Sequence, residues 1–133
     1  MIGAGAARRV LVVEDELMVG WLLQDMLTDL GCTVVGPAAR IAEALAMIDV
    51  EAIDAAVLDV NLNGELSYPV ADALRAHGIP FAFSTGYHKA SVRDGYQEQA
   101  VVQKPYQASD LARVLTGLLP VGPLTTLAAS PWR

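Results

Sequence analysis

Four short apolar runs of this sequence end in side chains that could take part in metal or phosphate chemistry. The run VLVV leads into Glu14 and Asp15, AAVL into Asp59, FAFS into Thr85, and VVQ into Lys104. If these runs are parallel strands, their carboxyl ends bring three carboxylates, a hydroxyl and an ammonium to one edge of a sheet. Such a set suits phosphoryl transfer to an aspartate, where catalysis is mostly positioning and charge neutralisation.

The carboxylates raise an electrostatic problem that a cation would solve. Three neighbouring carboxylates repel one another and cannot all stay ionised without a compensating charge. Mg²⁺ prefers oxygen ligands, and Lys104 adds a point charge for a carboxylate or a phosphoryl oxygen. Each residue also has a simpler explanation, since Asp59 could end a turn and Glu14–Asp15 could be an acidic first helical turn. The matching position of all of them at strand ends favours one shared site.

The elements that would position these residues alternate along the chain. Runs rich in β-branched residues predict strands, and apolar residues at helical spacing predict helices, the first of which should end at Gly31. Strands are predicted over residues 8–15, 32–38, 54–60, 79–86 and 100–103, and helices over 16–31, 40–49, 69–78 and 108–119, with a polar loop over 61–68 and a weakly helical segment over 87–99. Strands without polar alternation, separated by helices, predict an α/β fold with a parallel sheet covered on both faces.

Composition narrows the class of protein. The 133 residues suit one domain, and with 53% hydrophobic and 18% charged residues disorder is not expected. A net charge of −6 without a basic cluster argues against nucleic-acid binding. Every apolar run is interrupted before it could span a membrane, and the first nine residues are too short for a signal peptide. A cytoplasmic protein is expected, with the single cysteine, Cys32, as a small core residue.

The segments VLVVEDE, VLDVNLNG, FSTG and VVQKPY, in this order and spacing, resemble the signatures of the response-regulator receiver domain of two-component signalling. The resemblance runs from about residue 10 to about residue 119. It implies a flavodoxin-like (βα)5 three-layer sandwich, with a parallel five-stranded sheet of order 2-1-3-4-5. It also implies a receiver domain over 8–119 and a C-terminal tail over 120–133 without an output domain.

The same resemblance implies a role for each residue at the strand ends. Asp59 matches the phosphoacceptor, and Thr85, Gly86 and Lys104 match phosphoryl-binding and switch positions, with a cis peptide at Lys104–Pro105. The implied cofactor is Mg²⁺ or Mn²⁺, held by Glu14, Asp15, Asp59 and the main-chain carbonyl of Asn61. The protein is then a phosphoacceptor signalling protein that supports its own Mg-dependent aspartyl phosphorylation and dephosphorylation, not a conventional enzyme.

The sequence departs from the receiver pattern at Val101, where most receivers carry an aromatic residue that rotates inward on phosphorylation. The stretch PFAFSTGYHKA resembles the FATGUY subgroup, with Ser84 in place of alanine. We therefore expect the loop from Gly86 onwards to carry the signal. Tyr87 could hinder the attacking water or contact a partner, and both interpretations stay open. Trp21 is expected in the core or on the helix surface, with partner docking the less favoured role.

The resulting hypothesis is a stand-alone response regulator that accepts a phosphoryl group on Asp59. The donor would be a sensor histidine kinase, with the HWE type as one candidate, or a phosphotransfer protein. The output would be contact with a downstream protein, a relay step or a phosphate sink. One alternative is a receiver-fold binding module that is not phosphorylated. Another is an enzyme, but the acidic loop after the first strand would repel phosphate without a cation, and Asn61 stands where an aspartyl phosphatase would commonly carry a second acid.

Overall fold

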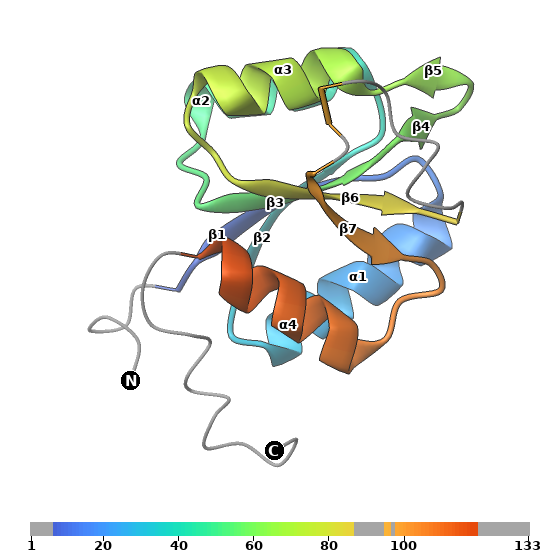
Figure 1. Ribbon diagram of the computed structural model, residues 1–133, viewed down its shortest axis with the longest axis vertical. Helices are drawn as coiled ribbons and strands as arrows, with labels where there is room; N and C mark the ends of the chain where they lie inside the picture. The colour runs from blue at the N-terminus through green and yellow to red at the C-terminus, as the bar shows by residue number, and fades with distance from the viewer. Residues whose placement is uncertain (1–6, 87–94, 97, 120–133) are drawn as a thin grey trace.

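The computed structural model describes residues 7–86, 95–96 and 98–119 of the chain. These residues form a five-stranded parallel sheet with helices on both faces (Figure 1). The strands of the sheet are β1 (Arg9–Val13), β2 (Thr33–Ala38), β3 (Ala55–Asp59), β6 (Phe81–Thr85) and β7 (Ala100–Gln103). The helices are α1 (Leu17–Asp29), α2 (Ile41–Val50), α3 (Tyr68–Ala76) and α4 (Ala108–Leu118). A small hairpin of β4 (Asn61–Leu62) and β5 (Glu65–Leu66) follows β3.

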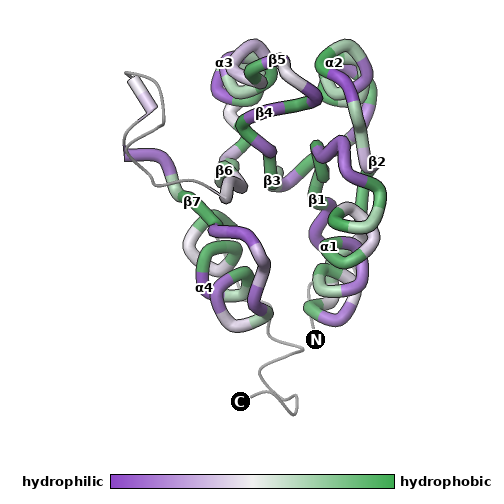
Figure 2. Tube along the Cα trace, turned by 90° about the vertical axis from the view of Figure 1, so that its right-hand side faces the viewer, coloured by the Kyte–Doolittle hydropathy of each residue, from purple (hydrophilic) through white to green (hydrophobic). Residues whose placement is uncertain are grey.

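The sheet has the order β2-β1-β3-β6-β7, which confirms the predicted order 2-1-3-4-5 once the hairpin strands are set aside. Helices α2 and α3 cover one face, and α1 and α4 cover the other (Figures 1 and 2). The expected weak helix falls mostly on residues outside the described part of the chain, as do the tail over 120–133 and Tyr87. None of the helices described is both long and apolar enough to cross a membrane.

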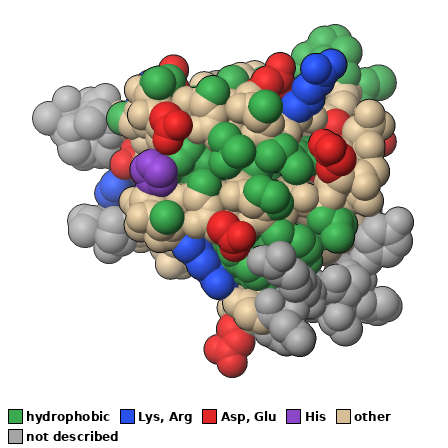
Figure 3. Space-filling model, turned by 90° about the horizontal axis from the view of Figure 1, so that it is seen from above, with side chains coloured by type: hydrophobic (Ala, Val, Ile, Leu, Met, Phe, Trp, Pro, Cys, Tyr) green, Lys and Arg blue, Asp and Glu red, His purple; other side chains and the backbone are tan. Residues whose placement is uncertain are grey.

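Continuous apolar strands serve this fold because each strand is buried on both faces. Along β1, Leu11 and Val13 pack toward the α2–α3 side, while Val10 and Val12 pack toward the α1–α4 side. Figure 3 looks onto the α2–α3 layer and shows apolar side chains along the middle of that face with charged ones around them. Cys32 belongs to the α1–α4 core, as predicted, and burial raises the pKa of its thiol to about 11.

The glycine expected to end helix α1 lies two residues beyond the last helical residue, Asp29. Gly31 has a φ of 87°, in the left-handed region that glycine adopts without steric cost. The N–H of Cys32 then donates to the carbonyl of Leu27 at 3.0 Å, which closes the last turn. This turn leads the chain directly into β2.

The predicted polar loop over 61–68 is wrong in part, because residues 61–66 form the β4–β5 hairpin. Asn63 and Gly64 stand at its tip with φ values of 54° and 94°, the positive pair that a type I′ turn requires. The side-chain oxygen of Asn61 also accepts the N–H of Gly64 at 2.7 Å. The dipeptide Asn-Gly is the sequence signal for this turn.

We expect Gly64→Ala to lower the free energy of unfolding by about 1 kcal/mol, because alanine is strained at this positive φ. A Cβ at Gly64 would meet nothing within 4 Å, so the loss would come from backbone strain alone. Gly117→Ala is the matched control, since Gly117 is exposed in α4 with open space around it and no positive φ. Urea unfolding of Gly117→Ala should show a free energy of unfolding that is higher by a few tenths of a kcal/mol. Equal effects of the two substitutions would contradict the turn assignment.

Candidate functional site

The predicted residues meet in an open cleft of about 860 Å³ at the carboxyl edge of the sheet. Strand register explains the meeting, because Asp59 on β3 lies beside Ser84 on β6, and Thr85 lies beside Gln103 on β7. The last residues of these three strands therefore lie within one residue of the same level, at the edge where parallel sheets commonly carry their sites. Of the predicted residues, those on the wall of the cleft are Asp15, Asp59, Asn61, Thr85, Gly86 and Lys104.

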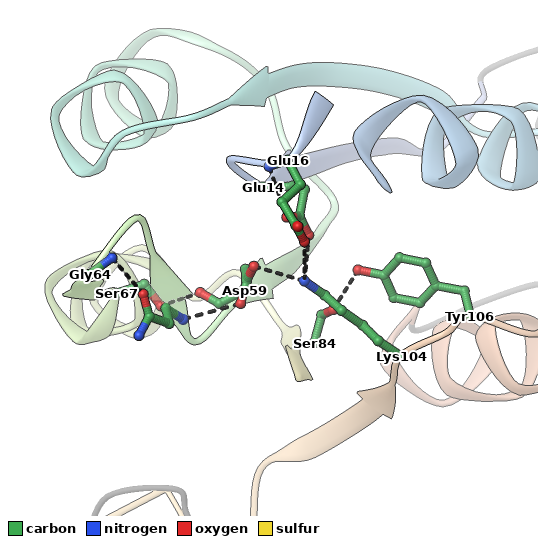
Figure 4. Close-up of polar contacts among 9 residues, drawn as sticks. Glu14, Glu16, Asp59, Gly64, Ser67, Ser84, Lys104 and Tyr106 are labelled. Atoms are coloured by element: carbon green, nitrogen blue, oxygen red, sulfur yellow. Dashed lines mark hydrogen bonds and ion pairs between the residues drawn. The ribbon is translucent and has the colours of Figure 1, made fainter. Parts of the chain in front are cut away.

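The ammonium of Lys104 lies among the carboxylates (Figure 4). Its Nζ atom is 2.9 Å from Oδ2 of Asp59, 3.1 Å from Oε1 of Glu14 and 3.8 Å from Oε1 of Glu16. Burial by itself lowers the pKa of Lys104. The hydrogen bond to Asp59 and the negative charges of Asp59 and Glu14 outweigh that effect, so the pKa of Lys104 stands above its usual value. The lysine therefore stays charged and partly neutralises the cluster.

Asp59 is only 7% exposed, and three polar contacts hold it in place. Its Oδ2 atom accepts from Lys104, and its Oδ1 atom accepts the N–H of Asn61 at 3.1 Å. Its main-chain carbonyl accepts the hydroxyl of Ser67. Ser67 stands at the N-cap of α3, yet its hydroxyl makes no cap hydrogen bond and binds the Asp59 carbonyl instead. Local backbone and α3 together thus hold the carboxylate at the base of the cleft.

The carboxylates of Glu14, Asp15 and Asp59 fit a hard cation. One oxygen from each lies within 4.8 Å of the others. Burial, followed by the charge of Asp59, raises the pKa of Glu14 to about 7. Its Oε1 atom is buried with no hydrogen bond, and its contact with Lys104 is ionic. A divalent cation would supply the missing partner, and oxygen donors of this kind are those that Mg²⁺ prefers.

The other predicted residues have distinct positions. Thr85 is buried at the end of β6, and its carbonyl accepts the N–H of Lys104 at 2.9 Å. The Lys104–Pro105 peptide is cis, as the resemblance implied. Gly86 has no positive φ, and a Cβ there would meet nothing within 4 Å, so it leaves the cleft open. Val101 is half-buried on β7 and packs against the α2–α3 core, while the metal-binding role of the Asn61 carbonyl stays a prediction.

The sequence did not identify three further residues of the site. Ser67 binds the backbone of Asp59, and its place within the predicted loop over 61–68 gave no sign of this contact. Tyr106 forms a buried hydrogen bond with Ser84, and the sequence marked Ser84 only as a departure from a motif. Glu16 lines the cleft as a third acidic neighbour of Lys104, and the run Glu14–Asp15–Glu16 was its only signal.

Comparison with known proteins gives a family match over most of the chain. Residues 10–116 match the family described as the response regulator receiver domain. The solution structure of SdrG from Sphingomonas melonis Fr1 is 43% identical, with a TM-score of 0.76, and the match covers 84% of this chain and 96% of that one. The solution structure of the BeF3-activated conformation of SdrG from Pseudomonas melonis Fr1 is 42% identical, with a TM-score of 0.75 and the same coverage.

Among curated proteins, the transcriptional regulatory protein PdtaR of Mycobacterium tuberculosis (strain H37Rv) is 27% identical over 112 residues. The match covers 81% of this chain and 55% of PdtaR, so the chain spans about half the length of the curated relatives it matches.

We expect Lys104→Met to lower the free energy of unfolding by about 2 kcal/mol at pH 8 in EDTA, because it leaves the carboxylates without their counter-charge. Methionine keeps an apolar stem, so the change tests mainly the charge. Arg113→Met is the control, because it removes only the exposed pair with Asp110 and should cost less than about 0.5 kcal/mol. Urea unfolding that gave equally small losses for both variants would show that Lys104 does not balance the site.

Proposed function

Because the chain belongs to the response regulator receiver domain family, we propose that it accepts a phosphoryl group on the carboxylate of Asp59. The observation that carries the proposal is the placement of Lys104 between Asp59 and Glu14 at the base of an open cleft. The carboxylate is buried enough to be held in one orientation, yet it lines the cleft from which a donor can approach. We further propose that its output is contact with a downstream protein, a relay step or a phosphate sink.

The reaction follows from the charges around Asp59. A carboxylate oxygen attacks the phosphorus of a phosphohistidine, a P–O bond forms, and the P–N bond breaks with its electron pair going to the imidazole nitrogen. The product is an acyl phosphate with added negative charge. Lys104 and Thr85 both line the cleft, and we propose that their ammonium and hydroxyl groups meet the phosphoryl oxygens. The presence of the acidic cluster together with Thr85 and Lys104 also argues against the alternative of a binding module that is not phosphorylated.

Receiver domains bind Mg²⁺ at an acidic pocket, and this chain has the corresponding cluster. We propose that Glu14, Asp15, Asp59 and the carbonyl of Asn61 hold the ion. When bound, Mg²⁺ neutralises charge on the carboxylates and on the incoming phosphoryl oxygens. The protein's own part is to hold the acceptor carboxylate, to keep Lys104 charged and to leave the cleft open beside Gly86.

The phosphodonor needs a surface beside the cleft, and α1 offers one. Four large apolar side chains near the start of this helix are exposed: Leu17 at 64%, Met18 at 75%, Trp21 at 55% and Leu22 at 43%. We call these four residues the α1 patch. Glu16, which lines the cleft, directly precedes them, so a helix docked on the patch would lie next to Asp59. A sensor histidine kinase, with the HWE type as one candidate, or a phosphotransfer protein would present such a helix.

We expect intact mass spectrometry to show one labile phosphoryl group after incubation with acetyl phosphate and Mg²⁺, and none on Asp59→Asn. EDTA should abolish the adduct, and Asp15→Asn should require a much higher Mg²⁺ concentration because it removes a charged ligand. Asp72→Asn is the matched control on α3, away from the cleft. Phosphorylation of Asp59→Asn at the wild-type level would move the acceptor elsewhere. An adduct that forms equally well in EDTA would rule out the proposed metal site.

We expect Trp21→Ala to slow phosphotransfer from an autophosphorylated histidine kinase by tenfold or more. A Trp that becomes buried on docking is a frequent anchor of an interface, and its truncation costs on the order of 2 kcal/mol of binding free energy. Phosphorylation by acetyl phosphate should be unchanged, because the small donor needs no docking surface. The control is Val50→Ala, which removes an exposed apolar residue at the end of α2. Equal rates for Trp21→Ala and the wild type with the kinase would exclude the α1 patch as the donor surface.

A further inference from the structure

A pair of buried hydroxyls lies behind the cleft. Ser84 on β6 and Tyr106, two residues beyond Lys104, form a hydrogen bond with each other (Figure 4). Ser84 is 1% exposed and Tyr106 is 6% exposed. Burial raises the pKa of Tyr106 to about 12, so its hydroxyl stays protonated at neutral pH and either oxygen can act as donor. A hydroxyl pair in a dry layer is costly unless each group satisfies the other, and here they do.

The pair lies on the opposite face of the sheet from Thr85. Along β6, Phe81 and Phe83 belong to the α2–α3 core, whereas Ala82 belongs to the α1–α4 core. Strand alternation therefore directs Ser84 toward α1 and α4, where Tyr106 packs with Leu111 and Leu115 of α4. At position 84, an alanine would pack against this otherwise apolar layer equally well. Packing alone therefore does not explain the hydroxyl group of Ser84.

That reason is the position of Lys104. The main-chain N–H of Lys104 donates to the Thr85 carbonyl at 2.9 Å, and two residues later Tyr106 binds Ser84. Two consecutive residues of β6 thus clamp the chain on either side of Lys104–Pro105. The side-chain contacts of Lys104 with Asp59 and Glu14 must change once Asp59 carries a phosphoryl group. The two links to β6 involve neither carboxylate, so they can keep the lysine in place through that change.

We propose that Ser84 and Tyr106 are a positioning pair, whose hydrogen bond holds the Lys104 backbone so that the ammonium can meet a phosphoryl oxygen on Asp59. This inference rests on the proposed acceptor role of Asp59 and adds two residues that do not touch the phosphoryl group. Their effect should therefore appear in the affinity for a phosphoryl group or its mimic, beyond any loss of stability.

The experiment is a double-mutant cycle on the full chain with Ser84→Ala, Tyr106→Phe and the double variant. The affinity for beryllofluoride, a phosphoryl mimic, is measured in Mg²⁺ by titration, and stability is measured separately by urea unfolding. Tyr96→Phe is the matched control, because Tyr96 is also buried and its hydroxyl donates to Asp72 on the α3 face of the molecule. It loses the same atom from a hydrogen bond that has no link to Lys104.

We expect each single variant to bind beryllofluoride about fivefold more weakly, as the loss of one buried hydrogen bond implies. The double variant should be no weaker than either single one, because both remove the same bond. Tyr96→Phe should lose stability but keep the wild-type affinity. Wild-type affinity in Ser84→Ala and Tyr106→Phe would overturn the inference and leave the acceptor role intact, and so would losses that multiply in the double variant. A wild type that does not bind beryllofluoride would overturn the acceptor role and the inference with it.

Discussion

The ion pairs of Lys104 are the interaction on which the site depends. Glu14 and Asp59 are almost fully buried, and two such carboxylates would repel strongly if nothing stood between them. The lysine offsets this repulsion with contacts of 2.9 and 3.1 Å, and it is itself held charged by the same two acids. One ammonium does not neutralise the whole acidic cluster, which includes Asp15 and Glu16 as well. The site is therefore stable enough to fold, yet it retains a negative charge that favours a cation.

The sheet makes this arrangement possible because apolar strands, without polar side chains along their length, hold the charged residues in place at their ends. β1 and β3 lie side by side in the centre of the sheet, and their apolar residues face both cores. Parallel register then brings residues 45 positions apart, Asp59 and Lys104, within hydrogen-bonding distance. The energetic cost of clustering the charges falls at the strand ends, where the cleft gives them partial access to water. Stability and chemistry are thus separated along each strand.

This separation explains how much of the site the sequence can predict. Apolar runs mark the strand ends, so the sequence correctly predicts that Asp15, Asp59, Thr85 and Lys104 meet at one edge of the sheet. The β4–β5 hairpin is not predicted, because its strands are only two residues long and show no apolar pattern, although the turn chemistry of Asn-Gly is local. Ser67 and Tyr106 are beyond this kind of prediction. Their hydroxyls bind groups 8 and 22 residues away, and such contacts depend on packing that no local pattern records.

Ser67 and Tyr106 also suggest how the site communicates with the rest of the fold. Ser67 binds the carbonyl of Asp59, and the next residue, Tyr68, packs its ring 5.7 Å from Phe83 and 5.5 Å from Tyr96. The guanidinium of Arg75 on α3 lies over the ring of Tyr96, with its Cζ atom 3.7 Å from the ring centroid. On the other face, Tyr106 connects Ser84 to the core around α4. Val101 packs against the α2–α3 core, whose aromatic residues come from α3, β6 and position 96, so β7 contributes no aromatic side chain to it. Polar and aromatic contacts therefore connect the site around Asp59 to both helical layers. Residue 101 is a valine, so these contacts do not depend on an aromatic side chain at that position.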